Sequence, residues 1–355
     1  MLARCIWRYL MITKTHFGEV SGKPVEKYTI ENQNQTRLSV LTYAGIVQEF
    51  SVIDNNERVN LVLSSDRIEG FSENTYNINR VIGRTAGRIT KGTWTQDGVT
   101  HHVPTNDGEN TLHSGPEGVG TQFFDVKSVD EDKNQLQLTY TALESVDGFP
   151  GDLDITVTYT LTENDTVDVT FTGHQTKQAG VFNPTVHMYF NLANPGITDL
   201  TDHDLFINSD QHLAVNAEKC PTGELIDNAG TPFDLKHHHD LGEILPELKK
   251  TTVEQGFDDV FKVPANQDTV AAKVTDRVSG RHVAIHSDRN GIVAFTESQI
   301  GNDVKYLNLG ESKPWMAVAL EAQTLPDSEN HPELGDVSIA ADETQEYHIQ
   351  YVYGK

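Results

Sequence analysis

The sequence predicts an all-β fold, a large antiparallel β-sandwich with few short helices. Three features of the sequence lead to this prediction. Apolar and polar residues alternate with a period of two along much of the chain, dipeptides that favour tight turns separate the alternating stretches, and helical periodicity is scarce. An alternation of period two places one face of a strand on a core and the other in water, which is typical of antiparallel sheets.

The alternation is clearest in four stretches, residues 136–140, 155–161, 167–171 and 347–353. In each of them every second residue is aliphatic or aromatic, and most of the residues between are polar. We expect each stretch to form a strand. The turn-favouring dipeptides are Asp97-Gly98, Asp107-Gly108, Asp147-Gly148 and Asn290-Gly291.

The best helical candidate is Leu241–Gln255, and it is weak because it contains Pro246. The chain shows no alternation of strands with long helices, no internal repeat, and no long linker rich in Gly, Ser or Pro. We therefore expect residues 11–355 to form a single domain, although the chain length of 355 residues alone suggests two. Residues 1–10 mix apolar side chains with two arginines, and Met11 offers a second start. We expect this segment to be an N-terminal extension outside the core.

The charge and the cysteine content argue against several classes of protein. The chain carries 52 acidic and 27 basic residues, a net charge of −25, which argues against a nucleic acid or an anionic membrane as partner. No apolar run reaches the roughly 20 residues that a membrane-spanning helix needs. Cys5 and Cys220 are the only cysteines, which excludes a disulfide framework and a Cys-rich zinc site. Since no convincing export signal is present, we expect a cytoplasmic protein, either a monomer or a homodimer.

Five segments place charged or imidazole side chains among apolar strand residues, which is uncommon unless a site requires it. The first, residues 79–89, contains Arg80, Arg84 and Arg88. Because a guanidinium offers a rigid fork of donors, these arginines suit an anion or a hydroxyl-rich ligand. The alternative is that they are solvated strand residues paired with the many carboxylates of the chain.

Two further segments each contain a histidine. His113 stands beside a Gly-Pro turn in residues 110–116, a plausible position at the mouth of a site, although a lone histidine is more often structural. His187 stands inside the apolar, aromatic stretch 183–192. A core imidazole with its hydrogen bonds satisfied is the alternative to a functional role there.

The last two segments contain carboxylates. Asp258 and Asp259 lie between aromatic residues and either form a turn or accept hydrogen bonds from a ligand. Glu321 lies within the apolar run 318–322. A carboxylate is costly to bury unless it is paired, so we interpret Glu321 as a site residue.

No metal or cofactor is expected. The three consecutive histidines at 237–239 diverge in either a helix or a strand, and no spacing typical of zinc ligands supports them, so we interpret them as a solvated loop. The glycine-rich signatures of phosphate and dinucleotide binding are absent, as is the Gly-x-Ser-x-Gly nucleophile motif.

Taken in order, the five segments resemble the aldose 1-epimerase (galactose mutarotase) family, from about Gly18 to the C-terminus. Each motif alone is moderately specific, and five in the family's order make a strong case. The motifs are Gly-Arg-x-Ala-Gly-Arg-Ile, Leu-His-Ser-Gly, Asn-Pro-Thr-Val-His-x-Tyr-Phe-Asn-Leu, Gly-Phe-Asp-Asp and Leu-Glu-x-Gln-x-x-Pro-Asp.

The resemblance implies a single β-supersandwich domain that binds a small-molecule sugar in a cleft and interconverts its α and β anomers without a cofactor. It implies that Glu321 is the general base at the C1 hydroxyl and that His187 is the general acid at the ring oxygen O5. It also implies that three side chains, His113, Arg88 and Asp258, orient the sugar by hydrogen bonds. Gly87 occupies a position where some members have Asn, so backbone or water must replace that contact.

Two departures from the family pattern concern substrate preference. Asp259 stands where many members have His, and Arg289-Asn290-Gly291 aligns with a Gln-Pro-Gly run, so a Gln that often contacts sugar hydroxyls is missing. Both changes are expected near the outer binding contacts.

The chemistry needs one base and one acid at the hemiacetal, each contributing on the order of 10²–10⁴-fold. An unperturbed Glu is ionised at neutral pH, so Glu321 can start as the base. We expect Asp258, if it lies close, to raise the pKa of His187 and so keep the proton that O5 needs. A glycosidase would instead use two carboxylates.

Three alternatives remain open. A hexose-6-phosphate 1-epimerase would need a basic pocket, for which Arg80, Arg84 and Arg289 are candidates. A disaccharide epimerase, acting on maltose for example, would need a more open cleft. A non-catalytic sugar-binding protein could retain Arg88 and His113 but would not need both His187 and Glu321.

Overall fold

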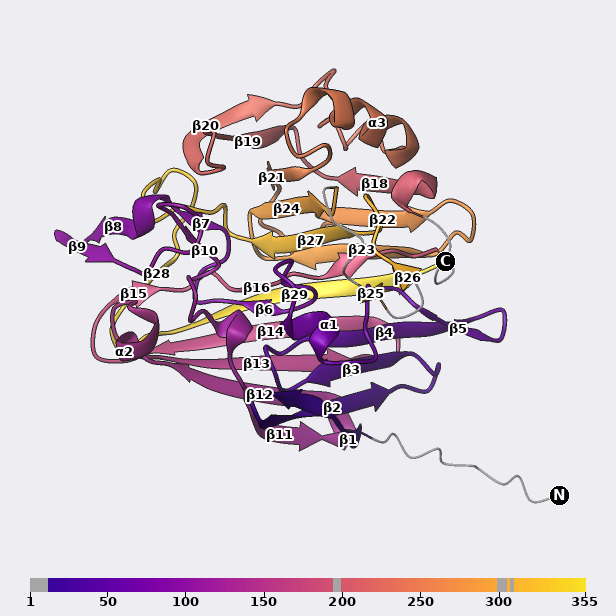
Figure 1. Cartoon of the computed structure of the whole chain (residues 1–355), viewed down its shortest axis with the longest axis horizontal. Helices are drawn as coiled ribbons and strands as arrows, with labels where there is room; N and C mark the ends of the chain where they lie inside the picture. Colours follow the sequence, from indigo (N-terminus) through magenta and orange to yellow (C-terminus); the bar gives the residue numbers. More distant parts are fainter. Residues whose placement is uncertain (1–11, 194–198, 299–304, 307–309) are drawn as a thin grey trace.

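The computed structural model describes residues 12–193, 199–298, 305–306 and 310–355. The expected N-terminal extension, residues 1–10, lies outside the described residues. Within the described residues, the chain folds into three large antiparallel sheets and several short strand pairs (Figure 1). The predicted all-β sandwich with few short helices is confirmed.

The first sheet has five strands in sequence order, joined by successive hairpins. Its edge strand carries an irregularity between His16 and Gly18. The strands are β1 (Ile12–Val20), β2 (Lys23–Glu31), β3 (Arg37–Leu41), β4 (Val47–Asp54) and β5 (Glu57–Asn60).

The second sheet has eight strands and contains all four stretches with the clearest sequence alternation, as β12, β13, β14 and β29, which are adjacent to one another. In sheet order the strands are β11 (Asp125–Asp130), β12 (Gln135–Ala142), β13 (Leu153–Leu161), β14 (Thr166–Gln175), β29 (Thr344–Gly354), β23 (His282–Ser287), β22 (Ala272–Asp276) and β18 (His203–Ile207).

The third sheet has six strands drawn from the second half of the chain. In sheet order they are β17 (Tyr189–Phe190), β27 (Val318–Gln323), β24 (Gly291–Thr296), β21 (Asp258–Lys262), β19 (Gln211–Val215) and β20 (Pro221–Asp227).

Short antiparallel pairs connect and cover the large sheets. In the turn between β8 and β9, Asp97 and Gly98 have φ of 52° and 79°, the left-handed conformations that a two-residue hairpin turn favours. The pairs are β6 (Val81–Ile82) with β16 (Thr185–Val186), β7 (Arg88–Ile89) with β10 (Thr111–Leu112), β8 (Thr93–Gln96) with β9 (Val99–His102), β15 (Gly180–Val181) with β28 (Ser338–Ile339), and β25 (Lys305–Tyr306) with β26 (Gly310–Glu311).

Helices are few and short, namely α1 (Glu69–Ser72), α2 (Glu144–Asp147) and α3 (Leu241–Thr251). The third is the helix expected from residue 241. The side chain of Asp240 accepts a hydrogen bond from the backbone N–H of Gly242 and so caps its first turn. Single 3₁₀ turns occur at Thr90–Gly92, Val119–Thr121, Glu131–Lys133 and Leu200–Asp202. None of the helices in the described part of the chain has the length and apolar character to cross a membrane.

The largest hydrophobic core joins all three sheets. It includes Val40 of β3, Val157 of β13 and Leu320 of β27, and in Figure 1 the eight-stranded sheet runs behind the other two. Because side chains alternate along a strand, a residue next to Leu320 on β27 points away from this core. The outward face of the six-stranded sheet is therefore free to carry a site.

Candidate active site

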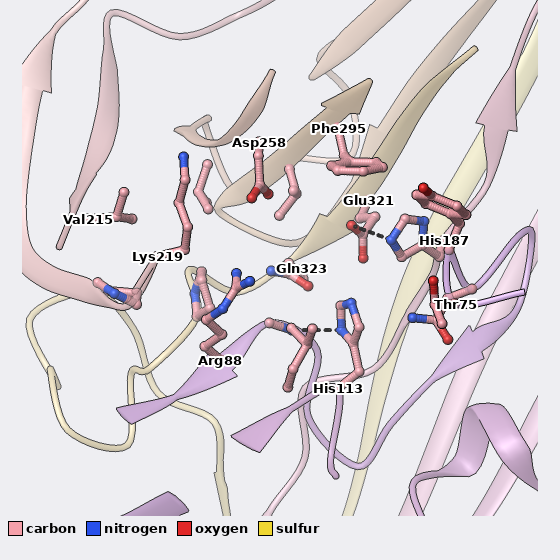
Figure 2. Close-up of a pocket in the computed structure, with 18 of the residues that line it drawn as sticks. Thr75, Arg88, His113, His187, Val215, Lys219, Asp258, Phe295, Glu321 and Gln323 are labelled. Atoms are coloured by element: carbon pink, nitrogen blue, oxygen red, sulfur yellow. Dashed lines mark hydrogen bonds and ion pairs between the residues drawn. The ribbon is translucent and has the colours of Figure 1, made fainter. Parts of the chain in front are cut away.

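A pocket opens over the outward face of the six-stranded sheet (Figure 2). With its open mouth it encloses about 800 Å³, a size suited to a small-molecule ligand. The residues that line it are Thr75, Tyr76, Asn77, Gly87, Arg88, Leu112, His113, His187, Tyr189, Val215, Lys219, Pro221, Asp258, Val260, Val293, Phe295, Glu321, Gln323 and Pro326.

The strand alternation accounts for which residues of β27 reach the pocket. Leu320 and Ala322 pack in the main core, whereas Glu321 and Gln323 line the pocket. The same rule applies to β21, where Asp258 lines the pocket. All six residues expected at the sugar site from the sequence line this pocket: Gly87, Arg88, His113, His187, Asp258 and Glu321.

His187 and Glu321 are in direct contact. The imidazole Nε2 lies 3.3 Å from the carboxylate Oε1, and the two residues are only 5% and 2% exposed. The imidazole stacks on the ring of Tyr189 with centroids 4.9 Å apart and meets Phe295 edge-on. This aromatic packing holds the imidazole against the carboxylate. Because its Nδ1 has no hydrogen-bond partner among the described residues, His187 is not a core histidine whose hydrogen bonds are all satisfied within the protein.

Burial shifts the pKa values of this pair in opposite directions. It raises the pKa of Glu321 to about 8, and the charge of Asp258 adds to the rise. It lowers the pKa of His187 to about 3, and the positive charge of Arg80 adds to the fall. The expectation that Asp258 raises the pKa of His187 is wrong, because burial dominates and the effect of Asp258 falls on Glu321. Both shifts favour a protonated Glu321 and a neutral His187 imidazole at neutral pH.

His113 is oriented by the backbone of Gly87. The N–H of Gly87 donates to Nδ1 of His113 at 3.2 Å, and the N–H of His113 donates to the carbonyl of Gly87 at 2.9 Å. Burial lowers the pKa of His113 well below its ordinary value, so its ring is neutral. Since Nδ1 accepts a hydrogen bond, the proton of the neutral ring is on Nε2. His113 thus offers a hydrogen-bond donor.

The same tautomer argues against a metal ion at this place. Among the described residues, His113, His187 and Glu321 are the one group whose potential ligand atoms all lie within 4.8 Å of one another. A protonated Nε2 cannot ligate a metal, and moving its proton to Nδ1 would set it against the N–H of Gly87. The donor set suits a hydroxyl-rich ligand better than an ion.

Arg88 and Asp258 lie at the side of the pocket away from His187 (Figure 2). Arg88 belongs to β7, and its Nε donates to Asp107 Oδ2 at 2.7 Å. Burial raises the pKa of Asp258, and the charge of Arg88 opposes that rise. This side of the pocket therefore presents both a strong donor and a strong acceptor.

The other arginines considered from the sequence do not line the pocket. Arg84 is fully buried and binds the Asp147 carboxylate with two hydrogen bonds of 2.7 and 3.0 Å. Arg80 donates to the carbonyl of Gly120 at 3.2 Å. Arg289 donates to Thr324 Oγ1 and lies 3.6 Å from the ring centroid of Tyr347. The suggestion that these three arginines form a phosphate site is wrong.

Two other expectations concern residues outside the pocket. Asp259 follows Asp258 on β21 and so points to the opposite face, where burial raises its pKa to about 7. It does not line the pocket. The histidines at 237–239 bind separate partners, since His237 contacts Asp234 and His238 contacts Glu243.

Several pocket residues were not identified from the sequence. Tyr189 and Phe295 surround the His187 imidazole, and Lys219, which forms an ion pair with Glu254 at 2.8 Å, lines the far end. Of these residues, Gln323 alone could have been predicted from the sequence, because a residue two positions after Glu321 on a strand lies on the same face of the sheet. The aromatic and lysine contacts depend on tertiary packing and leave no local pattern.

The fold and the pocket together define a β-sandwich with a buried acid–base pair surrounded by hydrogen-bonding groups. The family model described as Aldose 1-epimerase matches residues 26–352. The chain belongs to the aldose 1-epimerase family, and its enzyme class is that of the isomerases. Both sequence-based assignments are confirmed.

Relatives cover nearly the whole chain. A maltose epimerase of Levilactobacillus brevis is 36% identical over 96% of this chain and 98% of its own length. An aldose 1-epimerase of Streptococcus thermophilus is 35% identical, with 95% and 96% covered. The galactose mutarotase of Homo sapiens is 29% identical over 95% of this chain and 96% of its own length.

Solved structures share the fold. An aldose epimerase homologue from C. elegans superimposes with a TM-score of 0.84 at 24% identity, covering 92% of this chain and 98% of its own. A galactose 1-epimerase from Lactobacillus acidophilus gives a TM-score of 0.83 at 21% identity, covering 97% and 99%.

Proposed function

We propose that the protein is an aldose 1-epimerase that interconverts the α and β anomers of hexoses such as galactose and glucose. The observation that carries the proposal is the buried contact of 3.3 Å between His187 Nε2 and Glu321 Oε1. Anomer exchange requires a proton to leave the C1 hydroxyl and another to reach the ring oxygen O5. Both oxygens are bonded to C1, so the base and the acid must be neighbours, as these two side chains are.

Ring opening uses the ionised form of the pair. The Glu321 carboxylate takes the proton from the C1 hydroxyl, and protonated His187 gives its proton to O5 as the C1–O5 bond breaks. The sugar becomes an open-chain aldehyde with a hydroxyl at C5. The pair ends with the proton on Glu321 and a neutral imidazole, which is the arrangement that burial favours.

Ring closure reverses these transfers. After rotation about C1–C2, the C5 hydroxyl attacks the other face of the aldehyde and gives its proton to His187, while Glu321 protonates the former carbonyl oxygen. The pair returns to carboxylate and imidazolium. Each proton arrangement of the pair therefore matches one state of the sugar, and a proton shift across the 3.3 Å contact converts one into the other.

The remaining expected residues hold the ring. We propose that Arg88 donates to a sugar hydroxyl, that Asp258 accepts from one, and that His113 donates through Nε2–H. Gly87 acts through its backbone N–H, which fixes the His113 tautomer with the hydrogen bond of 3.2 Å. Such orientation places the hemiacetal against the acid–base pair.

Maltose is the second candidate substrate. The pocket extends beyond Asp258 to Val215 and Lys219, at the opposite end from His187 (Figure 2), and a relative at 36% identity is named a maltose epimerase. A hexose 6-phosphate is less well supported. Lys219 is already paired with Glu254, and Arg80, Arg84 and Arg289 are engaged elsewhere.

We further propose a cytoplasmic enzyme in which residues 11–355 act as one domain, as a monomer or a homodimer. Cys220 is buried and free, and the main core joins the three sheets. The net charge of −25 disfavours nucleic acid as a partner.

Polarimetry tests the proposal. Freshly dissolved α-galactose, α-glucose, α-glucose 6-phosphate and maltose enriched in one anomer should approach equilibrium faster with the protein, with the phosphate ester accelerated least. A protein that binds these sugars without accelerating any of them would be a sugar-binding protein and not an epimerase.

A further inference from the structure

Gln323 is a buried amide that the mechanism above does not use. Its side chain is 0% exposed, yet neither Nε2 nor Oε1 has a hydrogen-bond partner among the described residues. Leaving a buried polar atom without a partner costs about 1–3 kcal/mol. The residue also lines the pocket, so a ligand in the pocket can supply the missing partners.

A structural role would have left the amide bonded to the protein. Gln175, which is equally buried, has an Oε1 without a partner, but its Nε2 donates to the carbonyls of Pro150 and Gln178 at 2.8 Å each. Gln323 makes no such bond in the described part of the chain. The contrast separates an amide that stabilises the fold from one that is left available.

The position of Gln323 fits a ring hydroxyl remote from C1. It lies two residues after Glu321 on the same face of β27, which corresponds to about 6–7 Å along the strand. Figure 2 shows it between Glu321 and Arg88. A Cβ placed on Gly87 would lie 3.5 Å from Gln323 Nε2, so the amide reaches the part of the pocket beside Gly87.

We propose that Gln323 is a specificity-determining residue that binds a hydroxyl of the pyranose at C2, C3 or C4. Its Nε2–H donates and its Oε1 accepts, which matches a hydroxyl that both accepts and donates. The Arg289–Gly291 segment does not supply a second amide to the sugar, because the Asn290 amide donates to the Leu334 carbonyl. The inference rests on the proposed sugar substrate.

The test pairs one variant with three deoxy sugars. Gln323→Leu and wild type are assayed by polarimetry with glucose and with 2-deoxy-, 3-deoxy- and 4-deoxyglucose. Wild type should use one of these deoxy sugars about tenfold to a hundredfold less well in kcat/KM than glucose, since losing the hydroxyl leaves the amide without a partner. Gln323→Leu should lose that discrimination while raising KM for glucose about tenfold.

Stability provides a second readout. The melting temperature of Gln323→Leu should equal or exceed that of wild type, because a buried amide without partners is removed, whereas Gln175→Leu should melt lower. Gln323→Met serves the same purpose if the Leu variant does not fold. The inference would be overturned if an active Gln323 variant discriminated among the three deoxy sugars as strongly as wild type does.

The two proposals fail in different ways. If wild type does not accelerate mutarotation, the epimerase proposal is lost, and calorimetric titration with glucose still decides the role of Gln323. An unchanged affinity of Gln323→Leu for glucose in that titration would overturn the inference, and a loss of about tenfold would support it.

Discussion

The imidazole Nε2 of His187 lies 3.3 Å from the carboxylate Oε1 of Glu321, and both side chains are buried. Burial raises the pKa of the carboxyl to about 8 and lowers the pKa of the imidazole to about 3. In water a Glu side chain is already ionised at pH values above about 4.3, and a His side chain stays protonated up to about pH 6.5. A proton shared by the two groups would then reside on the imidazole and not on the carboxyl. Burial in the pocket thus favours the proton on the carboxyl.

The pH dependence of the reaction should report this pair. Between the two values the pair keeps one proton, so kcat/KM should be flat from about pH 4 to about pH 7 wherever the protein is folded. Above the Glu321 pKa of about 8, the pair becomes carboxylate and neutral imidazole. No proton is then available for O5, and kcat/KM should fall about tenfold per pH unit. Polarimetric rates from pH 5 to pH 10 measure the profile.

The two limits belong to the pair and not to either residue alone. A profile that changes near pH 6.5 would instead indicate an imidazole that titrates independently of Glu321. The matched control is the buffer-catalysed rate at each pH without protein.

Removal of either member should abolish most of the activity. Glu321→Gln and His187→Asn should each lower kcat on the order of 10²–10⁴-fold, because a positioned acid or base contributes that much. The double variant should be little worse than the single ones, since the two groups act as a unit. His348→Asn is the control, because His348 contacts Thr170 and Glu346 outside the pocket.

Additive losses in the double variant would mean that the two side chains work independently. Retention of activity in Glu321→Gln would remove the base from the proposal. Sugar affinity, measured by calorimetry, shows that each variant still forms the pocket.

Much of the fold could be predicted from local patterns. The period-two stretches became β12, β13, β14 and β29 because each packs one face on the core. The helix expected at Leu241–Gln255 forms as α3 despite Pro246, because its apolar residues are buried, but it ends at Thr251. The Asp147-Gly148 signal marks the end of α2, since a left-handed Gly also terminates a helix.

The site was only partly accessible to sequence reasoning. Glu321 was recognisable because a carboxylate in an apolar strand needs a partner. The direction of the pKa shift of His187 could not be predicted from the sequence, because it depends on how deeply the aromatic rings bury the imidazole. The separate roles of Arg84 and Arg88 also depend on the tertiary fold, as no local feature distinguishes two arginines four residues apart.

Gly87 provides a test of backbone positioning. Its φ is +77°, and a Cβ there would lie 2.5 Å from Cβ of Pro326. Gly87→Ala should therefore displace the Gly87–His113 hydrogen bond and raise KM for the sugar. Gly98→Ala is the matched control, because its φ is +79° and nothing lies within 4 Å. Both variants should lose about 1 kcal/mol or more of stability from the left-handed backbone, whereas only Gly87→Ala should change KM. Equal KM values in the two variants would contradict the positioning role.

Arg84 and Arg88 belong to one sequence motif, yet the structure predicts opposite effects for their replacement. Arg84 is fully buried and pairs with Asp147, which is 4% exposed. Arg84→Met leaves that carboxylate buried without its partner, so the free energy of unfolding should fall by about 3–5 kcal/mol. The activity per folded molecule should stay at the wild-type level.

Arg88 is partly exposed, and its ion pair with Asp107 is solvated, so Arg88→Met should change stability by less than about 1 kcal/mol. KM for the sugar should rise about tenfold, because a charged donor to a hydroxyl is lost. Denaturant unfolding and polarimetry on both variants measure the two effects. In the double variant Arg84→Met/Asp147→Leu much of the lost stability should return, since removing both charges leaves none unpaired. A rise in KM for Arg84→Met, or a large loss of stability for Arg88→Met, would reverse the assignment of structural and binding roles within this motif.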